Sequence, residues 1–369
     1  MSCPHPRPEA ITLKPFVVSP SNHERSGTGF LRIAPRHPAF AIPYNPPVNE
    51  FELIARFFAR TPRASSVHLA VGDDAALLAP SPGCELVASV DMLVAGRHFF
   101  VDVDPEKLGH KTLAVNLSDM AAMGATPRWA LLAAAFPEDD AAWLGAFARG
   151  FHALADRHGV DLVGGDTTRG PLNLCVTILG EVPEGQALTR AGARPGDDIY
   201  VSGTLGDAAL AVAALTGRTT LDGPALAAVR ARLETPEPRI ALGAALRGIA
   251  TAALDVSDGL VGDLGHILLR SRVGATVDCA RVPRSPALSR LLEGPDRTLA
   301  LDCLLAGGDD YELCFTAPPA AGRLVAAIAA EMALPVARIG TITQGAGLVV
   351  RDEAGVPLSA LPRAFDHFA

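Results

Sequence analysis

The chain has 369 residues, of which 49% are hydrophobic and 20% charged, as in a soluble protein large enough for two folded domains. A net charge of −8 and an aromatic content of 5% argue against nucleic-acid binding, which needs basic surfaces and stacking rings. No apolar run reaches the length of a membrane-spanning helix. The six cysteines are scattered and form no CxxC pair, which favours buried thiols in a reduced, cytoplasmic protein over a disulfide or zinc scaffold.

The first 48 residues carry scattered prolines and show no helical or strand period. We therefore predict that residues 1–48 form a disordered tail, and that translation could begin near Val48. Periodic sequence starts at Asn49, where Phe51, Leu53, Ile54 and Phe57 follow the spacing of an amphipathic helix.

The clearest helix signal covers residues 104–124. Asp104 is a good N-cap, Pro105 fits the first helical position, and Gly124 ends the pattern. Asn116 and Asp119 lie three residues apart and share a face near the end of this helix. A carboxylate there faces the negative end of the helix dipole, and residues 115–126 contain no Lys or Arg. We therefore expect a positive group from elsewhere beside Asp119, the alternative being a solvated side chain.

The remaining sequence alternates short strands with helices. Strands are expected at 67–71, 85–90, 129–136, 161–163, 174–181, 199–202, 252–255, 311–316, 338–342 and 348–351, and helices at 140–158, 203–215, 260–271 and 322–332. Because the order is not a strict βαβ alternation, the pattern predicts an α+β fold. The Pro-Gly and charge content of residues 190–198 indicates a boundary between two domains, 49–195 and 196–369.

Aspartates occur repeatedly at the expected ends of these elements: Asp73, Asp74, Asp91, Asp119, Asp166, Asp255, Asp258, Asp309 and Asp310. Each alone is ordinary turn chemistry. Together they would repel one another unless cations neutralised them, and oxygen ligands without His or Cys favour Mg²⁺. Magnesium in turn indicates phosphate chemistry. The stretch Gly203–Gly206 before a helix suits a phosphate or a plain turn equally well, and no P-loop sequence is present.

Several longer motifs resemble the thiamine-monophosphate kinase family, within the superfamily of aminoimidazole ribotide synthetase. They are VGDDAALL (71–78), SVDMLVAGRHF (89–99), LGHKTLAVNLSDMAAMGATP (108–127), LVGGDTTRG (162–170), LTRAGARPGD (188–197), DVSDGL (255–260), GGDDYELCF (307–315) and FDHF (365–368). GDDAA marks only the superfamily, whereas the combination of the second, third and seventh motifs is specific. The resemblance runs in order from about residue 49 to the end.

The resemblance implies ATP-dependent phosphorylation of thiamine monophosphate to thiamine diphosphate, with several Mg²⁺ ions in a cleft between two α/β domains and a homodimer formed through the N-terminal domain. It implies metal ligands at Asp73, Ser89, Asp91, Asp119, Asp166, Asp255 and Asp258. It implies ATP contacts from Gly165, Asp166, Arg190 and Ser257, and substrate contacts from His98, Asp309 and Phe365. No general base is expected.

Two positions depart from the family pattern. Val90 stands where the family usually has Thr, and Asp309 stands where it often has Glu. Among alternatives, a selenophosphate synthetase would need a reactive N-terminal Cys with a nearby Lys, and the hydrogenase maturation relative would need a C-terminal Cys. Aminoimidazole ribotide synthetase and a non-catalytic nucleotide-binding relative remain as alternatives, although the latter predicts lost acidic ligands and the aspartates are all present.

Overall fold

The structure is a computed structural model that describes residues 50–363, and the expected N-terminal tail lies outside these residues. The helices are α1 (Glu50–Phe57), α2 (Pro105–Ala122), α3 (Ala141–His158), α4 (Asp207–Leu215), α5 (Gly223–Glu234), α6 (Ile240–Ala245), α7 (Leu260–Ser271), α8 (Pro286–Leu292), α9 (Arg297–Ala306) and α10 (Gly322–Glu331), with 3-10 turns η1 (Cys279–Arg281) and η2 (Pro319–Ala321).

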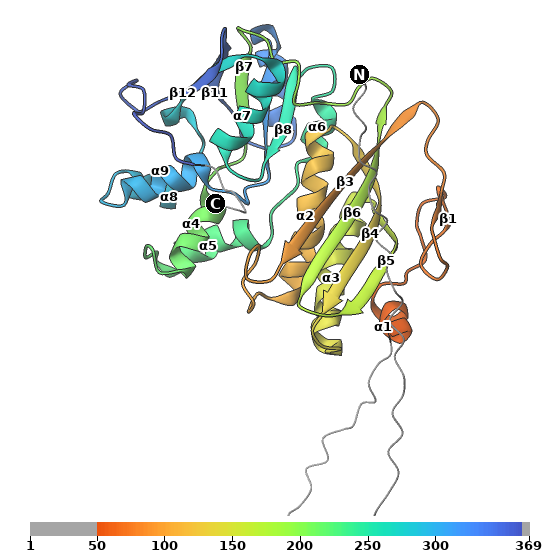
Figure 1. Cartoon of the computed structure of the whole chain (residues 1–369). Coiled ribbons are helices and arrows are strands. Elements are labelled where there is room, and N and C mark those ends of the chain that lie inside the picture. The colour runs from red at the N-terminus through yellow and green to blue at the C-terminus, as the bar shows by residue number, and fades with distance from the viewer. Residues whose placement is uncertain (1–49, 364–369) are drawn as a thin grey trace, which may run out of the picture. The chain divides into compact units, whose positions relative to one another are not determined.

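The strands belong to one small and two larger sheets (Figure 1). They are β1 (Val67–Leu69), β2 (Leu77–Leu78), β3 (Cys84–Val94), β4 (Thr126–Phe136), β5 (Asp161–Arg169), β6 (Asn173–Pro183), β7 (Asp198–Ser202), β8 (Ala252–Val256), β9 (Gly274–Asp278), β10 (Glu312–Ala317), β11 (Val336–Thr343) and β12 (Gly347–Arg351). Most neighbouring strands are antiparallel, and the helices do not alternate regularly with them. The expected α+β class is confirmed.

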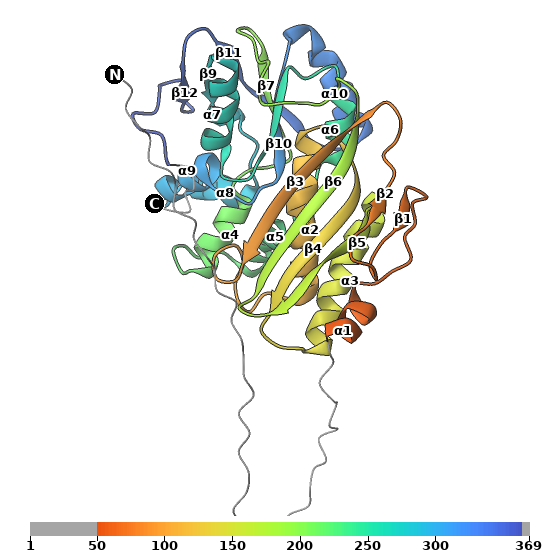
Figure 2. The same cartoon turned by 45° about the vertical axis from the view of Figure 1, so that its right-hand side comes forward.

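The first large sheet has the order β3-β6-β4-β5, and only the β4–β5 pair is parallel. Helices α2 and α3 cover one face of it, and the other face is open in both views (Figures 1 and 2). On the covered face, Leu132 and Val176 are buried, whereas Val90 and Met92 on the open face are half exposed. Successive side chains of β3 therefore point alternately to the helix-covered face and to the open face of the sheet.

Helix α2 is confirmed close to its expected limits. The Asp104 side chain accepts hydrogen bonds from the backbone N–H groups of Glu106 (2.8 Å) and Lys107 (3.2 Å), and Pro105 opens the helix. Gly124 follows with φ 64°, the left-handed conformation that favours glycine. Almost every side chain of α2 is buried, because the helix packs against the first sheet, α3, α6 and β8.

Two glycines let α2 and α3 approach closely. A Cβ atom on Gly109 would lie 2.0 Å from the Phe147 carbonyl oxygen, and one on Gly150 would lie 1.8 Å from the Glu106 carbonyl oxygen. Any side chain at either position would push the helices apart. This contact fixes α2, which carries the acidic residues of the expected site.

The second large sheet has the order β12-β9-β11-β7-β10-β8, with only the β12–β9 pair parallel. Its core is formed by side chains such as Val201, Leu254 and Cys314 together with α4, α7 and α9. A third apolar cluster joins the end of α2, through Ala121, to Leu242 of α6 and Leu313 of β10. The C-terminal end of α2 thus packs directly against the second sheet.

Several element limits differ from the expectation. Asp91 and Asp166 lie within β3 and β5 rather than in loops after them, whereas Asp255 lies within β8 as expected. Because aspartate is uncommon in strands, the sequence pattern predicts that a strand ends before it. Here the aspartate side chains face a cleft or solvent, where a strand tolerates them. Helices α5, α6, α8 and α9 and strand β9 were not expected, and Phe51 of α1 is 80% exposed although its spacing placed it on the apolar face. Within residues 50–363, no helix is both long and apolar enough to cross a membrane.

Candidate active site

The acidic residues gather where the end of α2 meets β3 and β8. The Ser118 hydroxyl donates a hydrogen bond of 2.6 Å to Asp255, which lies on β8. On the other side, the Ser89 hydroxyl of β3 donates to Asp119. The backbone N–H of Asp91 donates to the Asn116 side chain at 3.2 Å. One helix end therefore holds groups from both sheets.

These carboxyl groups raise one another's pKa. Burial raises the pKa of Asp91 to about 7, and the charges of Asp119 and Asp258 add to the shift. Burial also raises the pKa of Asp255 to about 7, again with a contribution from Asp119. Burial raises the pKa of Asp119, whereas a hydrogen bond from Ser89 and the positive charge of Arg190 act to lower it. The positive group expected beside Asp119 is thus Arg190, from the segment between β6 and β7.

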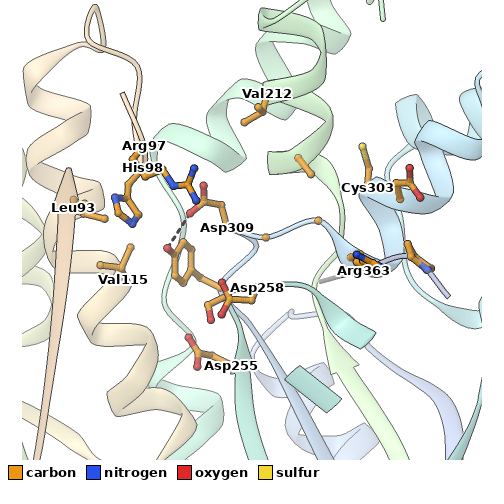
Figure 3. Close-up of a pocket in the computed structure, with 18 of the residues that line it drawn as sticks. Leu93, Arg97, His98, Val115, Val212, Asp255, Asp258, Cys303, Asp309 and Arg363 are labelled. Carbon is orange, nitrogen blue, oxygen red and sulfur yellow. Dashed lines mark hydrogen bonds between the residues drawn. The ribbon is translucent and has the colours of Figure 1, made fainter. Parts of the chain in front are cut away.

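A cavity of about 760 Å³ opens beside these acids (Figure 3). Its wall includes four predicted metal-ligand carboxylates and three further predicted contact residues: Asp91, Asp119, Asp255, Asp258, Ser257, His98 and Asp309. Arg97, Arg218 and Arg363 also line it. This larger cavity combines acidic and basic groups with apolar side chains such as Leu93 and Val212, as expected of a pocket for a charged organic ligand.

A second cavity of about 410 Å³ lies on the other side of the same acids. Ser89, Thr189, Arg190 and Arg270 line it. Asp119 and Asp255 line both cavities, so the two spaces share these carboxylates as a common wall. A smaller space lined by two arginines and a larger mixed one therefore meet at one acidic centre.

The segment that carries Arg190 is held from α7. The Ser271 hydroxyl accepts hydrogen bonds from the backbone N–H groups of Gly192 and Ala193, both at 3.1 Å, and donates to the Arg190 carbonyl at 3.3 Å. Gly192 has φ 122°, and a Cβ atom there would lie 2.3 Å from the Thr251 carbonyl oxygen. The segment consequently has little freedom, and the backbone of Arg190 is fixed.

The loop from Ser257 to Gly259 is closed by a residue that sequence reasoning overlooked. One carboxylate oxygen of Asp263 accepts from the backbone N–H groups of Ser257 (3.0 Å), Asp258 (3.0 Å) and Gly259 (3.1 Å). Burial raises the pKa of Asp263 to about 6 even so. An acid in the first turn of a helix following DVSDG is the signal that could have identified it.

His98 has a defined hydrogen-bonding role. The backbone N–H of Val94 donates to its Nδ1 atom at 3.0 Å, so the neutral ring carries its proton on Nε2. The turn is closed by the backbone, where Gly96 donates to the Phe99 carbonyl at 2.9 Å. His98 therefore offers an N–H donor through Nε2 at the wall of the larger cavity.

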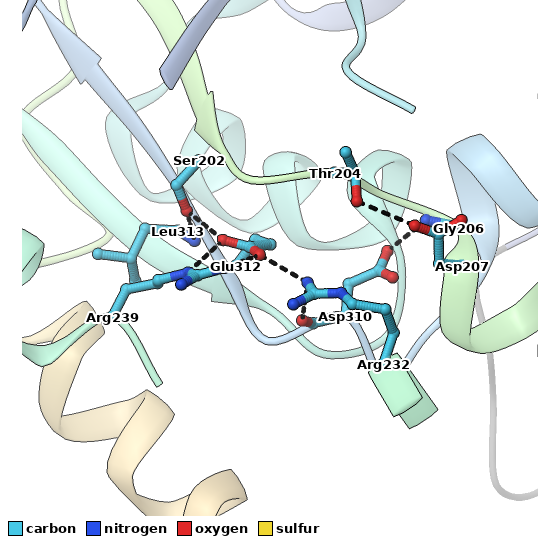
Figure 4. Close-up of polar contacts among 9 residues, drawn as sticks. All are labelled: Ser202, Thr204, Gly206, Asp207, Arg232, Arg239, Asp310, Glu312 and Leu313. Atoms are coloured by element: carbon cyan, nitrogen blue, oxygen red, sulfur yellow. Dashed lines mark hydrogen bonds and ion pairs between the residues drawn. The ribbon is translucent and has the colours of Figure 1, made fainter. Parts of the chain in front are cut away.

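The acidic residues in and after the loop before β10 have two different surroundings. Asp309 lines the larger cavity, whereas Asp310 and Glu312 are buried. Figure 4 shows the polar contacts of Asp310 and Glu312. Asp310 accepts from the Gly206 backbone N–H at 2.8 Å, and burial raises its pKa well above the usual value. Glu312 pairs with Arg232 at 2.6 Å and with Arg239 at 2.7 Å. Asp310, expected to be one of the site acids, instead anchors the loop that carries Asp309.

Three predicted ligands lie away from both cavities. Asp73 is exposed between β1 and β2, and its carboxylate accepts a hydrogen bond from the neighbouring Asp74 backbone N–H at 2.8 Å. Gly165 and Asp166 are exposed on β5. The strand register pairs Asp166 with Ala133, Cys175 and then Met92, which places it on the open face of the first sheet. Asp91, in register with Val176, faces α2, so the seven predicted metal ligands fall into two groups.

Phe365, the remaining predicted substrate contact, lies outside the described residues. Within residues 50–363, no group of three or more His, Cys, Asp or Glu side chains is arranged as a metal site. The charge of Asp119 nevertheless adds to the raised pKa of both Asp91 and Asp255. Such an arrangement suits Mg²⁺, which takes one or two carboxylates and completes its shell with water and phosphate.

Both halves of the chain match models of known families. Residues 72–182 match the AIR synthase related protein N-terminal domain, and residues 194–353 match the corresponding C-terminal domain. Thiamine-monophosphate kinase of Escherichia coli K12 is 47% identical over 325 residues, covering 87% of this chain and 98% of that protein. The chain belongs to the thiamine-monophosphate kinase family. The Bacillus subtilis member is 33% identical over 337 residues, covering 87% of this chain and 100% of that protein.

Solved structures agree with this family assignment. Thiamine-monophosphate kinase from Stenotrophomonas maltophilia K279a has 49% identity and a TM-score of 0.77, covering 84% of this chain and 98% of that chain. AaThiL complexed with AMPPCP and TMP has 30% identity and a TM-score of 0.69, covering 79% of this chain and 89% of that chain. The hydrogenase maturation protein HypE in complex with ATP, at 22% identity and a TM-score of 0.70 over 86% and 95%, shares the fold.

The structure also places two groups of this kinase-family site that sequence reasoning missed. Lys111 of α2 pairs with Asp309 at 3.2 Å, and the Tyr311 hydroxyl donates to the same carboxylate at 2.9 Å. The motif GGDDYEL contained the tyrosine, but only the fold brings the lysine beside it. Arg270 on α7 joins Arg190 in lining the smaller cavity in the same way.

Proposed function

We propose that this protein transfers the γ-phosphoryl group of ATP to the phosphate of thiamine monophosphate, giving thiamine diphosphate and ADP. Family membership supports the reaction, and one observation on the structure carries it. Asp119 and Asp255 form the common wall of a smaller cavity that carries two arginines and a larger mixed cavity, as a donor and an acceptor phosphate meeting at one acidic centre would require.

We assign the nucleotide to the side of the smaller cavity, with contacts from Arg190 and Ser257. The fixed backbone of Arg190 supports this role, because it keeps the start of the side chain beside the smaller cavity, and a guanidinium group binds phosphate oxygens well. Gly165 and Asp166 are the further ATP contacts that the family resemblance proposes. Their place on the open sheet face means that the nucleotide, or a second copy of the chain, would have to reach that face.

We assign thiamine monophosphate to the larger cavity. His98 offers Nε2–H to an anionic oxygen, and Asp309 offers a carboxylate to the cationic or amino part of the substrate. Phe365 is proposed as a stacking contact for a substrate ring. The two proposed contacts thus suit different parts of the substrate, an N–H donor for its phosphate and a carboxylate for its cationic part.

Mg²⁺ ions are proposed at Asp73, Ser89, Asp91, Asp119, Asp166, Asp255 and Asp258. The raised pKa values of Asp91 and Asp255 support cations at the central group, since these carboxylates are costly to ionise together without them. When bound, Mg²⁺ would neutralise both carboxylate and phosphate charge and so lower the repulsion between donor and acceptor.

The chain supplies orientation rather than proton transfer. The acceptor phosphate is already anionic at neutral pH, so no general base is needed, and we name no catalytic acid or base. Arg190 and the Ser257 loop would hold the donor, while His98 and Asp309 would hold the acceptor. The proposed rate enhancement comes from position and electrostatics.

We further propose a cytoplasmic homodimer built through the N-terminal domain, with domains at 49–195 and 196–369. The open face of the first sheet supports the dimer, because Leu86, Val90 and Met92 of β3 expose apolar side chains side by side along it. Light scattering after size-exclusion chromatography should give twice the chain mass. A Val90→Lys variant should shift the protein toward monomer.

The reaction is tested by incubating purified protein with ATP, Mg²⁺ and thiamine monophosphate, and measuring ADP release together with thiamine diphosphate. Both products should appear in equal amounts and should disappear with EDTA. Thiamine and the ribotide substrate of aminoimidazole ribotide synthetase serve as matched alternative acceptors. Product from the ribotide and none from thiamine monophosphate would overturn the assignment.

A further inference from the structure

Lys111 is a charged residue in an almost entirely buried helix. Its side chain is 3% exposed and lies in α2 between Leu108 and Val115, both fully packed. A buried ammonium group is costly unless it is paired and hydrogen-bonded. The partners of Lys111 therefore decide what the residue contributes.

Its two partners are both parts of the proposed substrate site. The Lys111 Nζ atom lies 3.2 Å from the Asp309 carboxylate and donates to the His98 carbonyl oxygen at 3.3 Å. His98 follows β3 of the first sheet, and Asp309 precedes β10 of the second. One ammonium group thus connects the two proposed substrate contacts. Both contacts line the larger cavity and are labelled in Figure 3.

The loop that carries Asp309 is held in an uncommon conformation. Asp309 has φ 67° and Tyr311 has φ 52°, and a bulky side chain at positive φ is an outlier that needs support from its surroundings. The support consists of backbone bonds from Asp309 to Ser257 and from Tyr311 to Val256, both 2.8 Å. The Tyr311 hydroxyl then occupies one Asp309 oxygen at 2.9 Å, and Lys111 occupies the other.

We propose that Lys111 is a positioning residue for the phosphate-acceptor substrate. Its ammonium group fixes the Asp309 carboxylate and the His98 turn in one arrangement before substrate enters. Both Asp309 oxygens are then oriented, so binding loses little further freedom. This inference rests on the proposed function, because it assigns Lys111 to the acceptor side of that reaction.

Lys111→Met tests the role, since methionine keeps the length of the side chain and removes its charge. The KM for thiamine monophosphate should rise by about tenfold or more, because Asp309 loses a charged partner. The KM for ATP should change by less than about twofold. Lys107→Met is the matched control, because Lys107 lies one turn earlier on α2 and pairs with Glu234 at 2.7 Å, away from both cavities. It should leave both KM values unchanged.

The double variant with Asp309→Asn shows whether Lys111 acts through the carboxylate. In the Asp309→Asn background, Lys111→Met should weaken thiamine monophosphate binding by less than it does alone, because only the bond to the His98 carbonyl remains to be lost. Calorimetry with a non-hydrolysable ATP analogue measures both losses. An equal loss in both backgrounds would mean that Lys111 contacts substrate directly or acts on the fold, and would overturn the proposal. So would equal increases in both KM values.

A second variant covers the case in which Lys111→Met does not fold. Lys111→Gln keeps a polar N–H group on the side chain but removes its positive charge, and a rise in the KM for thiamine monophosphate is again expected. An unchanged KM in this variant would refute the role. Wild-type turnover separates the two hypotheses: no product from wild type defeats the proposed reaction, whereas normal wild-type turnover with an unaffected Lys111→Gln defeats only this inference.

Discussion

Asp91→Asn should flatten the pH dependence of stability in the metal-free protein. Burial, with the charges of Asp119 and Asp258, raises the pKa of Asp91 to about 7 from its ordinary value of 3.8. The folded state therefore holds this proton more tightly than the unfolded state. The contribution of Asp91 to the free energy of unfolding is therefore fully present below about pH 4 and is lost as the pH rises through about 7.

The structure sets the size of this loss. A pKa of about 7 against 3.8 corresponds to about 4 kcal/mol in the free energy of unfolding. Asp119 and Asp255 compete for the same protons, and the Asp91 side chain is not fully buried, so the whole amount will not be expressed. We expect about 2 kcal/mol to be measured.

Denaturant unfolding in EDTA at about pH 5 and about pH 8 measures the effect. Wild type should lose about 2 kcal/mol more than Asp91→Asn between these conditions. Asp156→Asn is the control. Burial acts to raise the pKa of Asp156, but Arg60 and Arg63 hold it below its usual value, so this carboxylate stays ionised at both pH values. Equal slopes in wild type and Asp91→Asn would refute the electrostatic account of the acidic centre.

Three further substitutions test the site and its support. Asp119→Asn should lower turnover by about 100-fold or more while the circular dichroism spectrum stays unchanged, because the shared wall of the two cavities loses its charge. Ser271→Ala should raise the KM for ATP several-fold and leave that for thiamine monophosphate unchanged in steady-state assays, since only the Arg190 segment loosens. Gly150→Leu should destabilise the protein by about 3 kcal/mol or more in thermal unfolding, because α2 and α3 must separate.

Local patterns were sufficient for the elements whose signals are local. Helix α2 has an N-cap, a proline at its first position and a terminal glycine, and the structure ends it where those signals do. Strands that contain an aspartate were cut short, because the residue type suggests a turn whenever its surroundings are unknown. The register of β3 and β5, which follows only from the full strand, decides which face each aspartate takes.

Lys111 shows why part of the site could not be predicted. On a helix taken alone, a lysine one turn after Lys107 indicates a solvated face. Its burial results from α2 packing against the second sheet, and its partner Asp309 is almost 200 residues away in sequence. No pattern within a short window contains such a contact, so only the resemblance to a family or the fold itself can bring the two residues together.

The register of β3 also determines which face of the sheet carries Val90, at the position where the family resemblance led us to expect Thr. Ser89 and Asp91 face α2, so the side chain between them points to the open face, where Val90 is 58% exposed. A hydroxyl at this position could not have reached the larger cavity. It would have shared the open face with Asp166, across β6 and β4. Any consequence of the replacement therefore belongs to that face, to its proposed nucleotide and subunit contacts, and should leave the affinity for thiamine monophosphate unchanged.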